Sequence, residues 1–252
     1  MNRKIGFSTG VMFHVYNAMS ANIINISSDI GCAALELNVH TFPEHVNSLL
    51  GLSDDNVMFR QQLSCANMDS LSCHLPCNIN YICKVHDDVI SAKRSLQNIG
   101  IFSGVTKLVN YVVVHPDLVV DWDIFDDFPI AVAIENMDNR KNTFRTLQEL
   151  RDFFQKYPQF RLVFDVQHWV VNDGAISDIP AIIAEFGDRL AGIHLSGVGS
   201  DKYHVPVCRT RQRDLVESLQ NLPAHIPIIL EGVCEDVDEM KREFAYVTNI
   251  LI

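Results

Sequence analysis

Eight short, nearly all-apolar segments recur along this chain, and they limit its fold more than any other feature. Strand cores such as 112–114 (Val-Val-Val) and 228–230 (Ile-Ile-Leu) show no polar alternation. Strands of that kind are buried on both faces, which is typical of a parallel sheet covered by helices. We expect strands to begin near Ile5, Ala34, Leu71, Tyr111, Ala131, Leu162, Leu190 and Pro227.

Helical periodicity fills the stretches between these segments. We expect helices over residues 146–157, 179–186, 213–222 and 237–250. The stretch between the fourth and fifth strands is short and acidic over residues 121–127, so its helix should be shortened. In the helix over 146–157 one face carries Leu147, Leu150, Phe153 and Phe154.

Eight strand–helix units without a polar linker predict an α/β fold, a single (β/α)8 TIM barrel over residues 1–252. The length of 252 residues and a hydrophobic content of 48% suit one well-packed domain of this kind. The alternative is a doubly wound open sheet. Its phosphate fingerprint, G-x-G-x-x-G, is absent after the first strand, which disfavours it.

Seven of the apolar segments end in an acidic residue or a histidine. In a barrel, side chains at the carboxyl ends of the strands share one cavity. Histidines, glutamates and an aspartate around one cavity form a metal-ligand set. A single histidine at a strand end could instead be a core residue whose hydrogen bonds are satisfied locally. A glutamate after four apolar residues is harder to explain in that way, because a buried carboxylate must form an ion pair or bind a metal ion. The seven end residues are Glu36, His74, His115, Glu135, Asp165, His194 and Glu231.

The motif Asp165-Val166-Gln167-His168 adds a second potential ligand, because the histidine follows the strand end by three residues. The alternative is a turn aspartate beside an unrelated histidine. Further along, Arg209, Arg211 and Arg213 follow His204. They are consistent either with a solvated helix start or with a phosphate clamp beside the metal site.

Composition narrows the partners and the compartment. A net charge of −11 argues against broad, non-specific binding of nucleic acid. No apolar run approaches the roughly 20 residues of a membrane helix, and the N-terminus leads directly into a strand, so we expect neither a membrane span nor a signal peptide. The seven cysteines lack tight pair spacing, which favours reduced thiols and a cytoplasmic location.

These strand-end residues resemble those of the xylose-isomerase-like barrel superfamily, which holds sugar isomerases and epimerases together with the endonuclease IV type of abasic-site nuclease. The resemblance runs over nearly the whole chain. It implies that a common metal is held by four residues: Glu135, Asp165, His194 and Glu231.

The nuclease branch of the superfamily holds further metals. The resemblance to it implies that His74 and His115 bind a second ion, and that His168 and His204 bind a third. Two departures weaken this branch: Lys202 stands where the branch has an aspartate ligand, and Cys77 stands where it has an aromatic wedge that enters DNA.

The function implied is therefore a reaction dependent on one to three divalent ions (Zn, Mn, Co or Mg). We expect an isomerase or epimerase that acts on a small sugar or sugar phosphate through a metal-stabilised enediolate. Glu135 and Glu231 would be its acid–base pair, and His168 would bind a substrate oxygen. The alternative is an endonuclease IV-like phosphodiesterase acting at abasic sites in DNA. Nucleic acid is disfavoured by the acidic charge and the missing wedge, and a homo-oligomer is left open.

Six residues are predicted to contact substrate. Among them Glu36 has an alternative role, pairing with Arg3 or Lys4. The six are Glu36, His40, Asn136, Lys202, Arg209 and Arg211.

Overall fold

Eight parallel strands close into a barrel in this computed structural model, which describes residues 3–16, 20–39, 54–66, 68–75, 96–97, 109–200 and 204–252. The strands are hydrogen-bonded in the order β1-β10-β7-β6-β5-β4-β3-β2, and β1 pairs with both β2 and β10 to close the ring. The predicted single (β/α)8 barrel is therefore confirmed.

Each barrel strand begins within two residues of its predicted start. The sheet is parallel throughout, so the carboxyl ends of all eight strands lie at one end of the barrel. The strands are β1 (Ile5–Ser8), β2 (Ala34–Asn38), β3 (Ser70–His74), β4 (Val109–Val114), β5 (Ala131–Glu135), β6 (Arg161–Asp165), β7 (Leu190–Leu195) and β10 (Ile228–Leu230).

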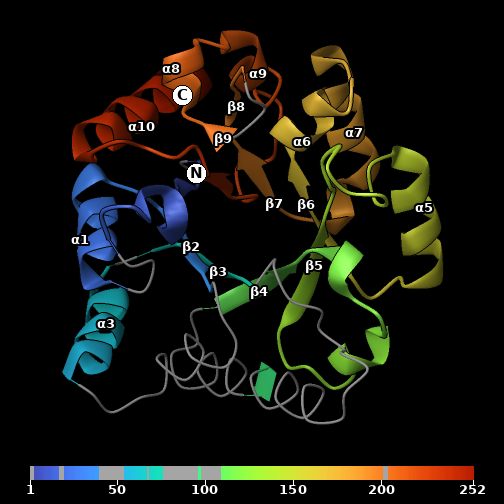
Figure 1. The fold of residues 1–252 in the computed structure, drawn as a ribbon, viewed down its shortest axis with the longest axis horizontal. Coiled ribbons are helices and arrows are strands. Elements are labelled where there is room, and N and C mark those ends of the chain that lie inside the picture. Colours follow the sequence, from blue (N-terminus) through green and yellow to red (C-terminus); the bar gives the residue numbers. More distant parts are fainter. Residues whose placement is uncertain are drawn as a thin grey trace.

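Helices surround the barrel, with α1, α3 and α10 on one side and α5 and α7 on the other (Figure 1). A small antiparallel pair, β8 (Gly197–Val198) and β9 (His204–Val205), follows the seventh barrel strand. The described helices are α1 (Ala21–Ile30), α3 (Asp54–Cys65), α5 (Leu147–Lys156), α6 (Val166–Val171), α7 (Ile179–Phe186), α8 (Val207–Thr210), α9 (Arg213–Glu217) and α10 (Val237–Leu251). Short 3-10 turns are η1 (Thr9–Met12), η2 (Pro116–Leu118), η3 (Trp122–Phe125), η4 (Ile176–Asp178) and η5 (Gly187–Arg189).

The connection between β4 and β5 is shortened as predicted, to the two 3-10 turns η2 and η3. Aromatic packing takes the place of the missing helix: the Trp122 ring lies 4.7 Å from the ring of Phe153 on α5 and 5.0 Å from that of Phe160. A turn of four residues thereby covers its side of the barrel with a large buried contact.

Side-chain capping fixes the start of α5, the helix against which Trp122 packs. Thr146 and Glu149 form a reciprocal capping box at the start of α5, so two of its free N–H groups are satisfied by side chains. The predicted starts of α5, α7 and α10 are confirmed. The predicted helix over 213–222 is wrong at its end, because α9 stops at Glu217 and the chain continues in hydrogen-bonded turns to Leu222.

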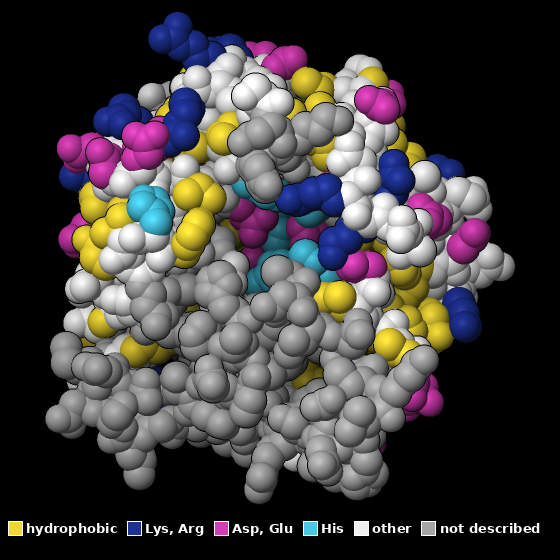
Figure 2. Space-filling model, viewed as in Figure 1, with side chains coloured by type: hydrophobic (Ala, Val, Ile, Leu, Met, Phe, Trp, Pro, Cys, Tyr) yellow, Lys and Arg dark blue, Asp and Glu magenta, His cyan; other side chains and the backbone are white. Residues whose placement is uncertain are grey.

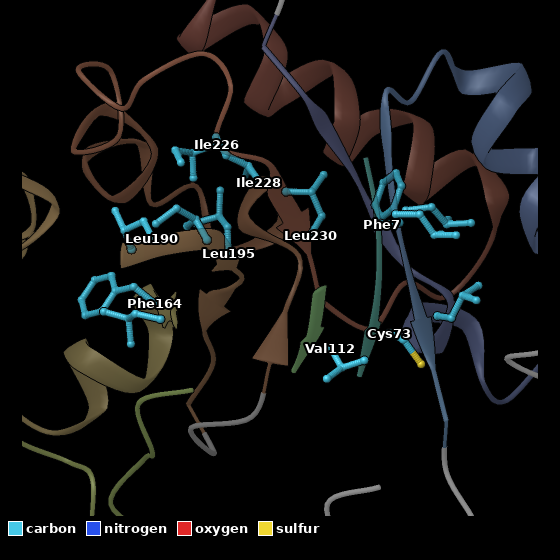
Figure 3. Packing of buried hydrophobic residues seen from close by; sticks show 14 of the residues in the cluster. Phe7, Cys73, Val112, Phe164, Leu190, Leu195, Ile226, Ile228 and Leu230 are labelled. Atoms are coloured by element: carbon cyan, nitrogen blue, oxygen red, sulfur yellow. The ribbon is translucent and has the colours of Figure 1, made fainter. Parts of the chain in front are cut away.

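The buried side chains form two groups, one on each face of the barrel strands. The larger group packs between the strands and the helices, and Figure 3 shows Phe7, Leu195 and Leu230 within it. The smaller group comes from β4 to β7 and alternates with the first along each strand, which places it inside the barrel. Its members are Tyr111, Val113, Ala133, Val163 and Ala191.

Register places polar residues at two depths inside the barrel. Asn38 is aligned with His74 at the ends of β2 and β3, and Glu36 is aligned with Ser72 two residues earlier. Because side chains two residues apart share a face, Glu36 and Ser72 lie one layer below the barrel's mouth. In the described part of the chain, no helix combines the length and the apolar character that crossing a membrane requires.

Close packing between β1 and β2 leaves no room for a side chain at Gly6. A Cβ built there would lie 1.6 Å from the carbonyl oxygen of Ala34, whereas one at Gly187 would meet nothing within 4 Å. We expect Gly6→Ala to lower the free energy of unfolding by about 1–3 kcal/mol or more, because the two strands must separate. Gly187→Ala should leave it unchanged or raise it by up to about 1 kcal/mol. Urea denaturation of both variants checks this; equal stabilities would contradict the packing described.

Candidate metal centre

Most of the predicted ligands lie at the carboxyl end of the barrel. His74, Glu135 and Asp165 are the last residues of β3, β5 and β6. His194 is the last but one residue of β7, and its side chain is fully buried. His115 and Glu231 directly follow β4 and β10. Parallel strands thus bring residues from six parts of the chain to one place, as the sequence indicated.

Glu135 lies at the centre of this group. Its Oε2 atom is 3.3 Å from Nε2 of His74 and 3.1 Å from Nε2 of His115, and its Oε1 atom is 3.1 Å from Nδ1 of His194. The same Nδ1 atom is 3.2 Å from Oε2 of Glu231. One buried carboxylate therefore contacts three histidines on three different strands or loops.

Three sets of side chains have donor atoms within 4.8 Å of one another, the spacing that one metal ion requires. The first is the predicted set of four. The other two share members with it: the second shares Glu135 and His194, and the third shares Asp165. The sets are Glu135, Asp165, His194 and Glu231; His74, Glu135 and His194; and Asp165, His168 and His204.

Opposite charges hold several of these groups ionised in spite of their burial. Burial alone would lower the pKa of His74, but the hydrogen bond to Glu135 and the nearby negative charges raise it to about 10. Burial alone would raise the pKa of Glu231, but His194 lowers it to about 2. For Asp165 burial dominates, and with the charges of Glu135 and Glu231 it raises the pKa to about 8. Of the carboxylates in this centre, Asp165 is thus the one for which nearby positive charges offset the cost of burial least.

The junction of β6 and α6 orients Asp165 and His168. Oδ1 of Asp165 accepts a hydrogen bond from the backbone N–H of His168 at 2.8 Å and caps α6, while Oδ2 is buried with no hydrogen-bond partner. Nδ1 of His168 lies 2.7 Å from the carbonyl oxygen of Asn136. The Nε2 atom of His168 is therefore left to face the cavity, the arrangement seen in histidines that bind metals.

Asn136 was predicted to contact substrate, but its side chain instead binds the backbone at the end of β6. Its Oδ1 accepts from the backbone N–H of Asp165 at 2.7 Å, and its Nδ2 donates to the carbonyl oxygen of Asp165 at 2.9 Å. Both polar atoms of this buried amide are satisfied by one residue. Asn136 fixes where Asp165 points and does not line the cavity.

His204 reaches the site from β9. Its Nδ1 atom is 2.8 Å from Oγ of Ser196, and its ring lies 5.1 Å from that of His168. The β8–β9 pair folds the chain back over the end of β7, which brings this histidine beside Asp165. Two other predicted contacts, His40 and Lys202, lie outside the described residues, as does Cys77.

Glu36 does not contact substrate from the rim, contrary to the prediction. It is 0% exposed, and it faces His194 and Ser72 inside the barrel. The alternative pairing with Arg3 or Lys4 is also wrong, since Arg3 donates to the carbonyl oxygens of Gln220, Leu222 and Leu251, and Lys4 donates to that of Asp69.

The arginines after His204 are engaged elsewhere. Arg209 forms a two-pronged ion pair with Glu239 of α10, and Arg213 pairs with Glu217 along α9. Arg211 ends α8 with a left-handed backbone. Neither Arg209 nor Arg211 lines the cavity at the metal centre, so the expected phosphate clamp is not formed there.

A cavity of about 290 Å³ opens above the centre, and Glu135, His168, His204 and Glu231 line it. Figure 2 shows histidine and acidic side chains gathered in a central hollow, with basic side chains beside it. Three charged lining residues were missed from the sequence: Asp138, Arg140 and Lys141. They follow Glu135 closely in the chain, and their charge directly after a barrel strand was the signal that could have revealed them.

The two basic residues at this cavity are each tied to a carboxylate. Arg140 pairs with Asp138, and Nζ of Lys141 lies 2.8 Å from Oδ2 of Asp117. A larger cavity of about 780 Å³ lies at the opposite end of the barrel, near Ser70, Ala131 and Arg161. None of the candidate ligands lines it, so the smaller cavity is the candidate site.

The residues present fit a divalent cation. The unpartnered, buried Oδ2 of Asp165 needs a positive partner, and the four-residue set offers three carboxylates and one imidazole, which suit Mn²⁺, Co²⁺, Zn²⁺ or Mg²⁺. A second ion would be held by His74, Glu135 and His194, with His115 also in contact with Glu135, and a third by Asp165, His168 and His204.

Replacing Asp165 by asparagine separates charge from shape. We expect Asp165→Asn to keep its stability without metal, since the raised pKa of about 8 leaves the Asp165 carboxyl mostly protonated and an amide has nearly the same shape, and to lose the stabilisation by added Mn²⁺ or Zn²⁺. In the wild type this stabilisation should reach about 2.7 kcal/mol at an ion concentration about 100 times Kd. Thermal unfolding with and without ion measures it. The exposed Asp152→Asn should respond as the wild type; an undiminished response of Asp165→Asn would remove this residue from the metal centre.

Solved structures share this fold across their full length. A 3-keto-D-glucoside 4-epimerase from E. coli superposes with a TM-score of 0.69 at 11% sequence identity and covers 98% of this chain and 100% of its own. The probable 3-DHS dehydratase AsbF from Bacillus anthracis gives 0.69 at 12% identity, with 99% of each chain covered. Endonuclease IV from Thermus thermophilus gives 0.65 at 16% identity, with 98% and 97% covered.

No protein-family model and no curated protein sequence matches the chain. At 11–16% identity the structural likeness establishes the fold and leaves the reaction to be argued from the site. The resemblance inferred from the strand-end residues is confirmed at that level: the chain has the fold of the xylose-isomerase-like TIM barrels.

Proposed function

We propose that this protein is a divalent-metal-dependent isomerase or epimerase of a small sugar or sugar phosphate. One observation carries the proposal: the donor atoms of Glu135, Asp165, His194 and Glu231 lie within 4.8 Å of one another beside a cavity of about 290 Å³. That volume is near the lower end of the range for small-molecule sites, which suits a monosaccharide better than a polymer.

The proposed proton transfer uses two glutamates of this centre. His194 lowers the pKa of both Glu135 and Glu231, so each is a carboxylate able to accept a proton. Glu231 would remove the proton from the carbon next to a carbonyl, and for isomerisation it would return that proton to the neighbouring carbon. For inversion, Glu135 would deliver a proton to the opposite face of the same carbon after taking it up from a protonated histidine in contact with it, such as His74. When bound, a divalent ion supplies Lewis-acid polarisation of the carbonyl and its neighbouring hydroxyl. His168 would hydrogen-bond a substrate oxygen through Nε2.

The basic residues at the cavity favour an anionic substituent on the substrate. Arg140 and Lys141 take the place that the sequence had given to Arg209 and Arg211. Their pairing with Asp138 and Asp117 orients the two cations beside the cavity without burying them, since the Arg140 side chain is 54% exposed. A phosphate group would gain charge-assisted hydrogen bonds there.

A second candidate, phosphodiester cleavage at abasic sites, is favoured by the two further ligand sets. One is His74, Glu135 and His194, with His115 also in contact with Glu135, and the other is Asp165, His168 and His204. Two ions about 3.5–4 Å apart would suit activation of water and stabilisation of a leaving oxygen. The net charge of −11 counts against a DNA substrate.

Glu231→Gln tests the proposed reaction. We expect turnover to fall by about 10²- to 10⁴-fold, because the amide cannot accept the proton, with little change in the far-UV circular dichroism. The measurement is deuterium incorporation at carbon from D₂O across a panel of ketoses, aldoses and their phosphates. The matched control is Glu217→Gln, on the surface of α9, which should retain full activity.

Incision of an abasic-site duplex, with metal analysis of the same protein, decides between the two candidates. No incision together with carbon–proton exchange supports the isomerase. Incision with two or three ions per chain, and no exchange on any sugar, would replace the proposal by the hydrolytic function.

Lys141→Met tests the anionic substituent. We expect KM for a phosphorylated sugar to rise about tenfold, because one charge-assisted hydrogen bond is lost, while KM for the unphosphorylated sugar changes little. Lys241→Met, an exposed lysine of α10 paired with Asp238, is the control. Equal changes for both sugars would contradict a phosphate contact at Lys141.

A further inference from the structure

Glu36 is a fully buried carboxylate that the proposed reaction does not use. It is 0% exposed, lies in the middle of β2, and does not line the cavity at the metal centre. A carboxylate placed at such depth costs free energy unless its partners compensate for lost water. Its position therefore calls for an explanation in terms of what it contacts.

Two contacts surround this carboxylate in the described part of the chain. Oγ of Ser72, the aligned residue on β3, donates to Oε2 of Glu36 at 2.7 Å. Nε2 of His194 forms a hydrogen bond with the same Oε2 atom at 3.3 Å, and it lies 3.1 Å from Oε1, which is buried and has no hydrogen bond of its own among the described residues. Ser72 thus fixes the orientation in which Glu36 meets the imidazole.

His194 stands between two acidic layers. Its Nε2 atom faces Glu36 below, and its Nδ1 atom faces Glu135 and Glu231 above, at 3.1 and 3.2 Å. A neutral imidazole carries one N–H and one lone pair, and the hydrogen bond at one nitrogen determines which function the other has. When a divalent ion takes the place of the proton on Nδ1, Nε2–H stays directed to Glu36 and the lone pair of Nδ1 points at the ligand set.

We propose that Glu36 is a positioning residue for the metal centre: through His194 it fixes the ring and its tautomer, and raises the basicity of Nδ1 as a ligand. This inference rests on the metal dependence in the proposed function and adds to it a residue that touches neither metal nor substrate. Carboxylates that accept from a ligating histidine have this effect in metal sites generally.

The decisive experiment measures metal affinity apart from catalysis. Competition between the protein and a chromophoric chelator for Mn²⁺ and Zn²⁺ gives Kd for the wild type, Glu36→Gln, Glu36→Ala and Ser72→Ala. We expect Glu36→Gln to weaken binding by about 10- to 100-fold, Glu36→Ala by at least as much, and Ser72→Ala by less, in the same direction.

Glu243→Gln is the matched control. Glu243 is also 0% exposed, but its carboxylate accepts from the backbone N–H groups of Val207 and Cys208, away from the metal centre. We expect this variant to lower the Tm of the metal-free protein while leaving Kd within about twofold of the wild type. A purely structural role for Glu36 would give the same pattern, a lower Tm with an unchanged Kd.

The outcomes separate this inference from the proposed function. A folded Glu36→Gln protein with wild-type Kd overturns the positioning role alone. If both Glu36 variants fail to fold, Ser72→Ala decides: an unchanged Kd overturns the role and a weaker one supports it. A wild-type protein that binds neither Mn²⁺ nor Zn²⁺ overturns both the inference and the metal dependence on which it rests.

Discussion

The contacts of the Glu135 carboxylate with His74, His115 and His194 are the interaction on which the mouth of this barrel depends. Each of its oxygens lies 3.1–3.3 Å from a histidine nitrogen, and the residue is 1% exposed. Removing one partner of a buried ion pair costs about 3–5 kcal/mol. The contacts form only where the four side chains reach the same level, so β3, β4, β5 and β7 must end at matching heights along the barrel axis. The closed parallel ladder provides that match, and the packing between strands and helices maintains it.

Protons and metal ions are alternative occupants of such a centre. Nearby carboxylates raise the pKa of His74 to about 10, which means that the cluster recruits protons to balance its negative charge. A divalent ion binds the same nitrogen lone pairs and carboxylate oxygens, and its binding therefore releases protons. The cluster has an excess of negative charge, and the raised pKa of Asp165 is its clearest sign. This excess is the physical reason that a bound cation would stabilise the fold as well as the substrate.

The sequence alone predicted the barrel, and for the same reason it indicated most of the residues that gather at the candidate metal centre. Strands buried on both faces are apolar without alternation, so a polar residue such as Glu135 or Asp165 at the end of such a run stands out. The parallel arrangement then brings all run ends together. Residues whose role depends on register or hydrogen bonding were not predictable in this way. Glu36 ends an apolar run, yet β2 continues to Asn38 and leaves the carboxylate one layer deeper.

Side chains outside the strands were the hardest to place. Asn136 follows Glu135 and was a reasonable candidate for substrate binding, but only the structure reveals that both its polar atoms bond to the backbone of Asp165. Arg209 and Arg140 have the same chemistry, and their positions depend on how two loops fold back. Arg209 meets the acidic Glu239 on α10, whereas Arg140 follows a strand that ends in the cavity. Proximity to a strand end was therefore a better guide than clustering of charge.

The two polar layers inside the barrel also account for its unusual interior. Barrel interiors are ordinarily filled by branched apolar side chains. Here Ser72 and Glu36 occupy the layer beneath His194, and Tyr111, the residue of β4 aligned with Ser72, belongs to the apolar group inside the barrel. Apolar residues in the same layer would pack more favourably than a buried carboxylate. Its presence directly under a ligand histidine is what one expects where a fold gives up stability to hold a functional group in one orientation.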